Sequence, residues 1–154
     1  MPDPQPAREV ITRSPEETIR LGRELAAELK PPLLILLSGD LGAGKTTLIK
    51  GIVAGLGAAA EDEVTSPTFT LIHKYQPALP ARTGPVYHVD LYRIAGLPDL
   101  ETLGLDDIFA ENSIVLIEWP DRLAFDPGRP ILRIRLDHLD ESSRRISLSP
   151  HRSP

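Results

Sequence analysis

The sequence predicts a single α/β domain, in which a mixed sheet carries flanking helices and ends in a C-terminal antiparallel hairpin. Two short and almost continuously apolar runs, Leu33–Ser38 and Ile114–Glu118, are typical of strands buried on both faces of a sheet. Segments with helical periodicity alternate with the strands, which is the order of elements in α/β proteins. The length of 154 residues, with 41% hydrophobic and 25% charged residues, is that of one globular domain.

The first helix is expected to begin at Ser14–Glu17. There the serine can cap the helix, the proline suits the first helical position, and the second glutamate completes a capping box. Pro31-Pro32 stops this helix, and Leu33–Ser38 follows as a strand. After a glycine-rich turn, the helical spacing of apolar residues predicts a second helix over Lys45–Leu56, which Gly57 is placed to end.

The second half of the chain is expected to complete the sheet. Phe69–Tyr75 and Val86–Tyr92 are predicted strands on either side of a loop rich in proline and glycine, and Pro98–Leu103 is a predicted short helix. Side chains alternate in character along Ile131–Leu136 and, more briefly, along Arg144–Leu148. These two segments are therefore predicted to form the closing antiparallel hairpin.

Composition excludes several classes of protein. The chain has no cysteine, which excludes a disulfide scaffold, a zinc ribbon, an iron–sulfur site and a thiol nucleophile. The formal net charge of −5 does not mark the whole molecule as a nucleic-acid binder. No apolar run approaches the roughly 20 residues that span a bilayer, and no secretory signal is visible, so a cytoplasmic protein is expected. The domain is expected to span residues 10–149, with a mobile leader at 1–9 and a tail at 150–154.

The segment Gly39–Thr46 matches the pattern G-x-x-x-x-G-K-[ST] of a phosphate-binding loop. Glycines let successive N–H groups converge on phosphate oxygens, Lys45 can reach the β- and γ-phosphates, and the Thr46 hydroxyl can bind magnesium. The alternative is a chance glycine-rich helix cap. The buried strand before the loop and the amphipathic helix after it favour nucleotide binding and a P-loop NTPase-like domain. The residues expected to contact the nucleotide are Gly39, Gly42, Ala43, Gly44, Lys45, Thr46 and Thr47.

A phosphate-loop site needs a second magnesium anchor, usually an acid that ends a buried strand. Glu118 ends a run as apolar as the strand before the loop, whereas Asp90 ends a weaker run. The alternative for either acid is a solvated carboxylate at a strand end; the pattern favours Glu118 as a metal ligand and leaves Asp90 undecided. Trp119, the only tryptophan, follows Glu118 and either packs or functions there. Thr65–Thr68 offers three hydroxyls that either order around magnesium and the γ-phosphate or form a turn.

Four motifs, in this order along the chain, resemble the TsaE family, the bacterial ATPases of tRNA threonylcarbamoyladenosine (t6A) biosynthesis. Together they are more specific than the phosphate loop alone, and the resemblance runs from about Ser14 to Ser149. The motifs are Gly39–Thr47, Ser66–Phe69, His88–Arg93 and Glu118–Pro120.

The resemblance implies a small ATPase that binds ATP with magnesium and acts on a complex of the TsaD and TsaB proteins, resetting it between turnovers. That complex places a threonylcarbamoyl group on adenosine 37 of tRNAs that read codons beginning with A, so tRNA is reached indirectly. By the family's pattern, Lys45 and Thr46 serve the phosphates and magnesium, and Glu118 is the second magnesium ligand. Asp90 belongs to the catalytic and switch region, and Trp119 to the same functional set.

Two other functions stay open from the sequence. A small-molecule kinase would use the same loop spacing, with Arg122, Arg129 and Arg133 as a phosphate-clamping lid, although the segment after Trp119 has prolines and little helical periodicity. A nucleotide-dependent binding module without useful turnover is the second. ATP consumption that depends on a small acceptor would indicate the kinase. ATP turnover measured with partner proteins added separates the binding module from the ATPase.

A partner surface is expected around Val64–Phe69 and Asp90–Arg93, extending to Trp119, because groups beside the γ-phosphate move with nucleotide state. The negative net charge favours protein over free tRNA as the first contact. Between residues 129 and 152, however, six arginines stand against three acids. These arginines either touch tRNA or nucleotide or are solvated on the hairpin.

Overall fold

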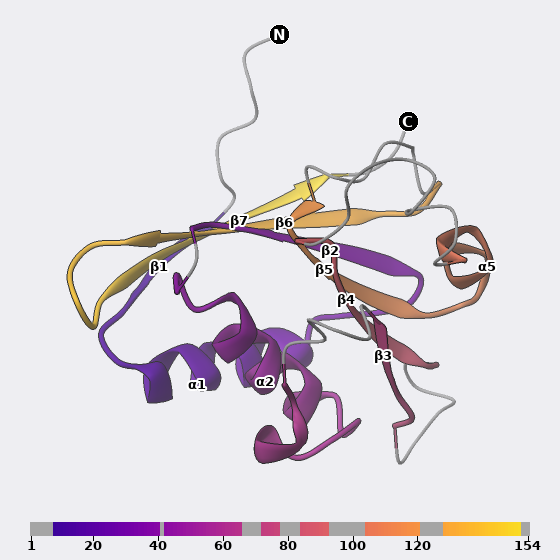
Figure 1. Cartoon of the computed structure of the whole chain (residues 1–154), viewed down its shortest axis with the longest axis horizontal. Helices are drawn as coiled ribbons and strands as arrows, with labels where there is room; N and C mark the ends of the chain where they lie inside the picture. Colours follow the sequence, from indigo (N-terminus) through magenta and orange to yellow (C-terminus); the bar gives the residue numbers. More distant parts are fainter. Residues whose placement is uncertain are drawn as a thin grey trace, which may run out of the picture.

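The computed structural model describes a seven-stranded mixed sheet with helices on both faces (Figure 1). The described residues are 8–40, 42–65, 72–77, 84–92, 104–120 and 128–151. The strands are β1 Arg8–Thr12, β2 Leu33–Ser38, β3 Ile72–Tyr75, β4 Val86–Asp90, β5 Ile114–Glu118, β6 Ile131–His138 and β7 Arg144–His151. The helices are α1 Pro15–Ala26, α2 Lys45–Gly55, the 3-10 turn η1 Glu61–Glu63, and α5 Leu105–Ala110.

The sheet order β1-β7-β6-β2-β5-β4-β3 brings the ends of three distant strands together. The central strands β6, β2, β5 and β4 run parallel, while β1, β7 and β3 are antiparallel to their neighbours. In register, Leu37 pairs with Glu118 and Glu118 pairs with Asp90. Carboxyl ends of parallel strands are where open α/β sheets bind their ligands, so this register sets the place of the site.

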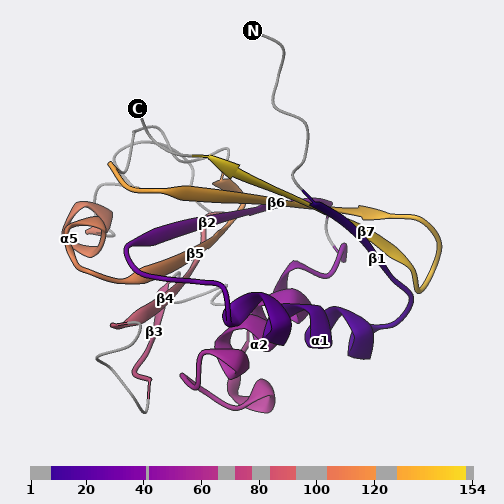
Figure 2. The ribbon, with the colours of Figure 1, turned by 180° about the vertical axis from the view of Figure 1, so that it is seen from behind.

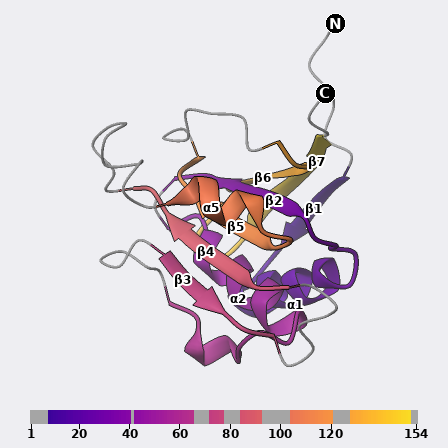
Figure 3. The same cartoon turned by 90° about the vertical axis from the view of Figure 1, so that its right-hand side faces the viewer.

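Each face of the sheet is covered by its own helices. Helices α1 and α2 lie side by side against one face (Figure 2), where Leu25 and Leu48 pack in a core with Ile35 of β2. Helix α5 covers part of the opposite face (Figure 3), and there Phe109 packs in a second core with Leu36. Strands β2 and β5 are thus buried on both sides, which explains their almost continuously apolar composition. No helix among the described residues is long and apolar enough to cross a membrane.

Several predicted elements are confirmed. Strands β2 and β5 have the predicted bounds, β6 and β7 form the predicted antiparallel hairpin, and α2 begins at Lys45. Ser14 caps α1 by accepting a 3.1 Å hydrogen bond from the N–H of Glu17. The Glu17 carboxylate accepts instead from the N–H of Arg13, at 3.1 Å, one residue before the position a capping box requires. Helix α1 ends at Ala26, before the prolines that were expected to stop it.

Strand β1 was not predicted, and the chain ends differ from expectation. Arg8 and Glu9, placed in the leader, pair with β7, which itself continues to His151 in the predicted tail. Strand β1 is a short edge strand whose partner lies more than a hundred residues away, so no local pattern identifies it. Its conformation depends on the tertiary fold.

The middle of the chain shows the other differences. Helix α5 was not predicted, although Leu105, Ile108 and Phe109 have the spacing of one buried helical face. The predicted helix Pro98–Leu103 lies outside the described residues. Strand β4 ends at Asp90 instead of Tyr92, and β3 is described from residue 72 onward.

Candidate functional site

The loop between β2 and α2 needs glycine for two separate reasons. A Cβ on Gly39 would lie 2.5 Å from the carbonyl oxygen of Leu136, so only glycine fits against β6. Gly44 caps α2 with a φ of 100°, in the left-handed region that favours glycine. These positions hold the N-terminus of α2 open for an anion, because its first N–H groups have no partner within the helix.

Lys45, the first residue of α2, is turned back onto the loop. Its ammonium donates to the carbonyl oxygens of Gly39 at 2.5 Å and Asp40 at 3.1 Å. The same Nζ atom lies 4.0 Å from the ring centroid of Trp119, within the range of a cation–π contact. The side chain is 5% exposed, so this positive charge is held in place at the loop.

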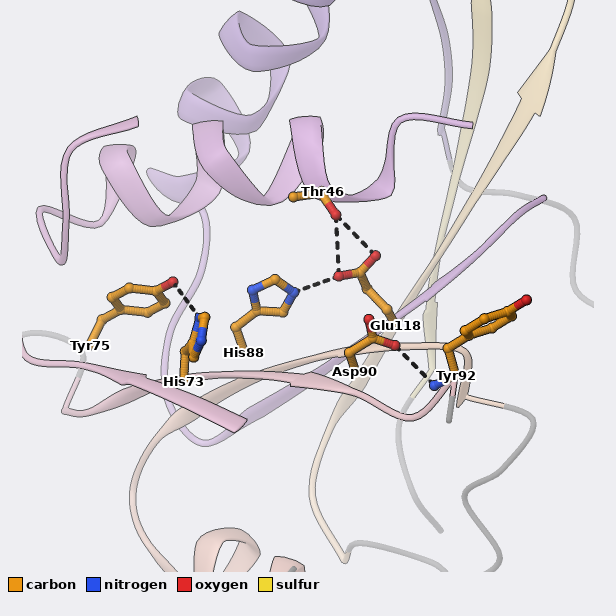
Figure 4. Close-up of polar contacts among 7 residues, drawn as sticks. All are labelled: Thr46, His73, Tyr75, His88, Asp90, Tyr92 and Glu118. Atoms are coloured by element: carbon orange, nitrogen blue, oxygen red, sulfur yellow. Dashed lines mark hydrogen bonds and ion pairs between the residues drawn. The ribbon is translucent and has the colours of Figure 1, made fainter. Parts of the chain in front are cut away.

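Glu118 stands at the carboxyl end of β5, where two side chains bond its carboxylate (Figure 4). The Thr46 hydroxyl donates to its two oxygens at 3.3 and 3.4 Å, and His88 Nε2 lies 2.6 Å from Oε2. Asp90 is the neighbour of Glu118 across the sheet, and its Oδ1 accepts a 2.9 Å hydrogen bond from the N–H of Tyr92. Both acids are buried, so the polar groups around them fix their geometry.

His88 is a site residue to which the sequence analysis assigned no role. It lies two residues before Asp90 on β4 and so shares its face of the sheet, a period-two signal that was available in the sequence. The side chain is fully buried, and its Nδ1 has no partner among the described residues. His73 packs edge-on against it and contacts the Tyr75 hydroxyl (Figure 4). Burial, and next the neighbouring His88, lower the pKa of His73.

A cavity of about 250 Å³ opens beside these groups. It is lined by Gly42, Ala43, Gly44, Lys45, Thr46, Thr47, Tyr92, Glu118 and Trp119. Eight of these nine were predicted site residues, and the ninth, Tyr92, was predicted only as part of the partner surface Asp90–Arg93. Gly39 and Asp90, also predicted, contribute around the cavity without lining it: Gly39 binds the Lys45 ammonium, and Asp90 neighbours Glu118.

Trp119 has an uncommon backbone conformation for its residue type. Its φ of 61° is the one positive value recorded for a non-glycine residue in the described part of the chain. A bulky residue in this region is strained, and such strain tends to occur at functional sites. In this conformation the indole contacts both Lys45 Nζ and the Tyr92 ring, whose centroid is 4.9 Å away. Trp119 therefore forms a wall of the cavity.

The donor set suits a hard cation that is shared with a phosphate. The Thr46 hydroxyl and the Glu118 carboxylate supply oxygen atoms, which magnesium prefers. Over the described residues, no group of three or more histidine, cysteine, aspartate or glutamate side chains could hold a metal. Magnesium usually takes one or two protein ligands and completes its shell with water and substrate phosphates, so these residues fit it.

The alternative of a kinase lid made of arginines is wrong for those arginines that the structure describes. Arg129 is buried away from the cavity and donates to carbonyl oxygens at the end of α5, including those of Phe109 and Glu111. Arg133 is paired in register with Leu36, on the face that α5 covers. Arg122 lies outside the described residues. No clamp of these arginines forms over the loop within the described part of the chain.

Other predicted surface residues can be located only in part. Val64 and Leu91 are both fully buried, each in one of the two hydrophobic cores, so their assignment to a partner surface is wrong. Thr65 is exposed. Ser66–Phe69 and Arg93 lie outside the described residues.

The family model described as "Threonylcarbamoyl adenosine biosynthesis protein TsaE" matches residues 12–146. The chain belongs to the TsaE family. This family takes part in t6A biosynthesis, as the resemblance implied.

Relatives from distant bacteria match this TsaE chain over most of its length. The tRNA threonylcarbamoyladenosine biosynthesis protein TsaE of Treponema pallidum is 34% identical, over 90% of this chain and 98% of that protein. The TsaE protein of a Nostoc species is 40% identical, over 88% of this chain and 81% of that protein. The crystal structure of Bacillus subtilis YdiB superposes with a TM-score of 0.68 at 33% identity, over 93% of this chain and 84% of that one. The predicted fold class is thereby confirmed.

Proposed function

We propose that this TsaE protein binds ATP with magnesium in the cavity and hydrolyses it, and that it acts in this way on the TsaD–TsaB complex. The observation that carries the proposal is the meeting of the Thr46 hydroxyl with the buried Glu118 carboxylate, at the helix N-terminus where Lys45 is held. A phosphate chain and its cation need these three kinds of group in one place.

The chain's own groups account for phosphate binding. Backbone N–H groups and the positive end of the α2 dipole attract the phosphates. Lys45 supplies a fixed positive charge, and preorganised charges of this kind stabilise the charge that develops in phosphoryl transfer. A triphosphate would exchange the contacts of Lys45 with the loop carbonyls for contacts with its own oxygens.

The side chains around Glu118 are proposed to serve cation binding and turnover. Thr46 and Glu118 would hold magnesium, which when bound neutralises charge on the β- and γ-phosphates. His88 holds the Glu118 carboxylate through Nε2, and Thr46 contacts the same carboxylate. Asp90 is placed beside Glu118 and is bonded by the Tyr92 N–H, which supports a role in orienting the attacking water or the following segment.

Alanine variants of the three oxygen-bearing residues are expected to separate cation binding from turnover. Thr46→Ala and Glu118→Ala each remove one proposed ligand, so both should raise the magnesium concentration that gives half-maximal ATP hydrolysis. Asp90→Ala should reduce turnover more than nucleotide binding. A magnesium titration of the hydrolysis rate checks all three variants. The largest magnesium shift in Asp90→Ala, with none in Glu118→Ala, would show that the two acids are assigned the wrong way round.

The partner surface is proposed to include the aromatic pair at the cavity. Tyr92 is 44% exposed beside Trp119, so a docked protein can sense this wall directly. Trp119→Ala is expected to weaken binding to the TsaD–TsaB complex with little loss of ATP binding, because the phosphates are held by the loop. Binding to the complex, measured with ATP and with ADP, checks this. Unchanged and nucleotide-sensitive binding would remove Trp119 from the surface.

Reconstitution with the partner proteins tests the proposed function as a whole. ATP hydrolysis and t6A formed on tRNA are measured with TsaD and TsaB, in the presence and absence of this protein. ATP hydrolysis that rises with the complex, together with more t6A, supports the proposal. ATP binding without turnover under all conditions would instead favour a nucleotide-dependent binding module.

A further inference from the structure

The arginine-rich hairpin includes one side chain that reaches the phosphate loop. Arg144 opens strand β7 and is half-buried. Its Nε donates to the carbonyl oxygen of Ala43 at 3.1 Å, and its Nη2 donates to that of Gly42 at 3.4 Å. Both acceptors belong to the cavity wall, about a hundred residues earlier in the chain. The guanidinium thus binds the backbone of the phosphate loop, although Arg144 itself does not line the cavity.

The same guanidinium also holds the turn between β6 and β7. Its Nη1 donates to the carbonyl oxygens of Asp140, Glu141 and Ser143, at 3.1, 3.3 and 3.0 Å. The turn is braced from within, because Asp140 Oδ1 accepts from the N–H groups of Ser142 and Ser143 at 3.0 and 2.8 Å. These backbone hydrogen bonds lower the pKa of Asp140. Arg144 therefore joins a braced turn to the phosphate loop through one planar group.

The contact with Ala43 has a consequence for the next N–H group. The carbonyl of one residue and the N–H of the following residue point in opposite directions across a trans peptide. Holding the Ala43 carbonyl towards Arg144 therefore directs the Gly44 N–H to the other side of the loop. Ala43 and Gly44 line the cavity, whereas Arg144 does not. A phosphate needs such N–H groups to be aimed in advance.

We propose that Arg144 is a positioning residue for nucleotide binding, which holds the Ala43–Gly44 peptide with its N–H available to phosphate and so makes the β6–β7 turn part of the nucleotide site. The inference rests on the proposed function, because it concerns the same loop. It also gives a role to Arg144, one of the hairpin arginines whose role the sequence analysis left open. A lysine cannot replace the group fully, since an ammonium lacks the rigid fork that reaches the two loop carbonyls and the turn together.

Arg145 is a matched control in the same strand. Its side chain is next in sequence and points to the opposite face of the sheet, where it pairs with Glu9 at 3.4 Å. It is nearly half exposed and has the same charge as Arg144. Removing Arg145 therefore changes the net charge equally without touching the loop.

The test compares Arg144→Ala, Arg144→Lys and Arg145→Ala with the wild type, by calorimetric titration with ATP and with ADP and by thermal melting. We expect Arg144→Ala to bind both nucleotides about tenfold more weakly or worse, since charge-assisted hydrogen bonds are lost. Both should weaken together, because the loop holds phosphates that ATP and ADP share. Arg144→Lys should be intermediate, and Arg145→Ala should bind as the wild type does.

Each other outcome has a defined meaning. Wild-type affinity in a folded Arg144→Ala protein would overturn the inference while leaving the proposed function intact. If that variant does not fold, Arg144→Lys decides: weaker binding there supports the inference, and wild-type affinity overturns it. Equal losses in Arg144→Ala and Arg145→Ala would indicate net charge instead of positioning. Failure of the wild type to bind ATP would overturn the proposed function itself.

Discussion

Replacing Lys45 by alanine is expected to abolish ATP hydrolysis and leave the fold intact. The ammonium is the fixed positive charge at the loop, held by the carbonyls of Gly39 and Asp40 and by the Trp119 ring. Loss of one preorganised group that stabilises a transition state lowers kcat by about a hundredfold or more. Lys45 belongs to neither hydrophobic core cluster, so the packing of the sheet should survive.

Lys50→Ala is the matched control for this variant. Lys50 lies on the same helix and is half-buried, but it does not line the cavity. The two variants change the charge equally. ATP hydrolysis is measured for both, with circular dichroism to confirm folding. Wild-type turnover in a well-folded Lys45→Ala protein would contradict the assignment of the site.

Replacing Gly51 by alanine is expected to lower the stability of the fold. Gly51 faces α1, and a Cβ there would lie 2.1 Å from the carbonyl oxygen of Ile19 and 3.0 Å from the Cα of Gly22. These are backbone atoms, so the helices must move apart. Alanine gains about 1 kcal/mol in helix propensity over glycine, whereas overpacking costs about 1–3 kcal/mol. With contacts this short the clash should dominate, and a net loss near 2 kcal/mol is expected.

Urea unfolding measures this loss as a change in the free energy of unfolding. Lys50→Ala again serves as the control, because it is the adjacent position and also becomes alanine. Because the phosphate loop leads directly into α2, ATP binding should also weaken in Gly51→Ala, together with the loss of stability. Stability equal to or above that of the wild type would mean that α1 and α2 separate without cost.

The phosphate loop was predictable because its requirements are local. A buried strand, glycines and a lysine at the start of a helix follow one another in the sequence, and the structure has them in that order. Glu118 was predictable for a related reason, because an acid after four apolar residues marks a strand end. The second acid could not be decided by pattern. Only the register of β4 with β5 places Asp90 beside Glu118.

The sequence by itself determined the elements whose signals lie within a few residues: the two buried strands, the loop and helix between them, and the closing hairpin. It also indicated the family, since motifs and their order along the chain can be identified without knowing which residues are in contact. The tertiary structure alone decided the contacts between distant segments. The pairing of β1 with β7, the bond of His88 to Glu118 and the reach of Arg144 to the loop each join distant parts of the chain. Such contacts have no local pattern, because they exist only after packing has brought the two segments together.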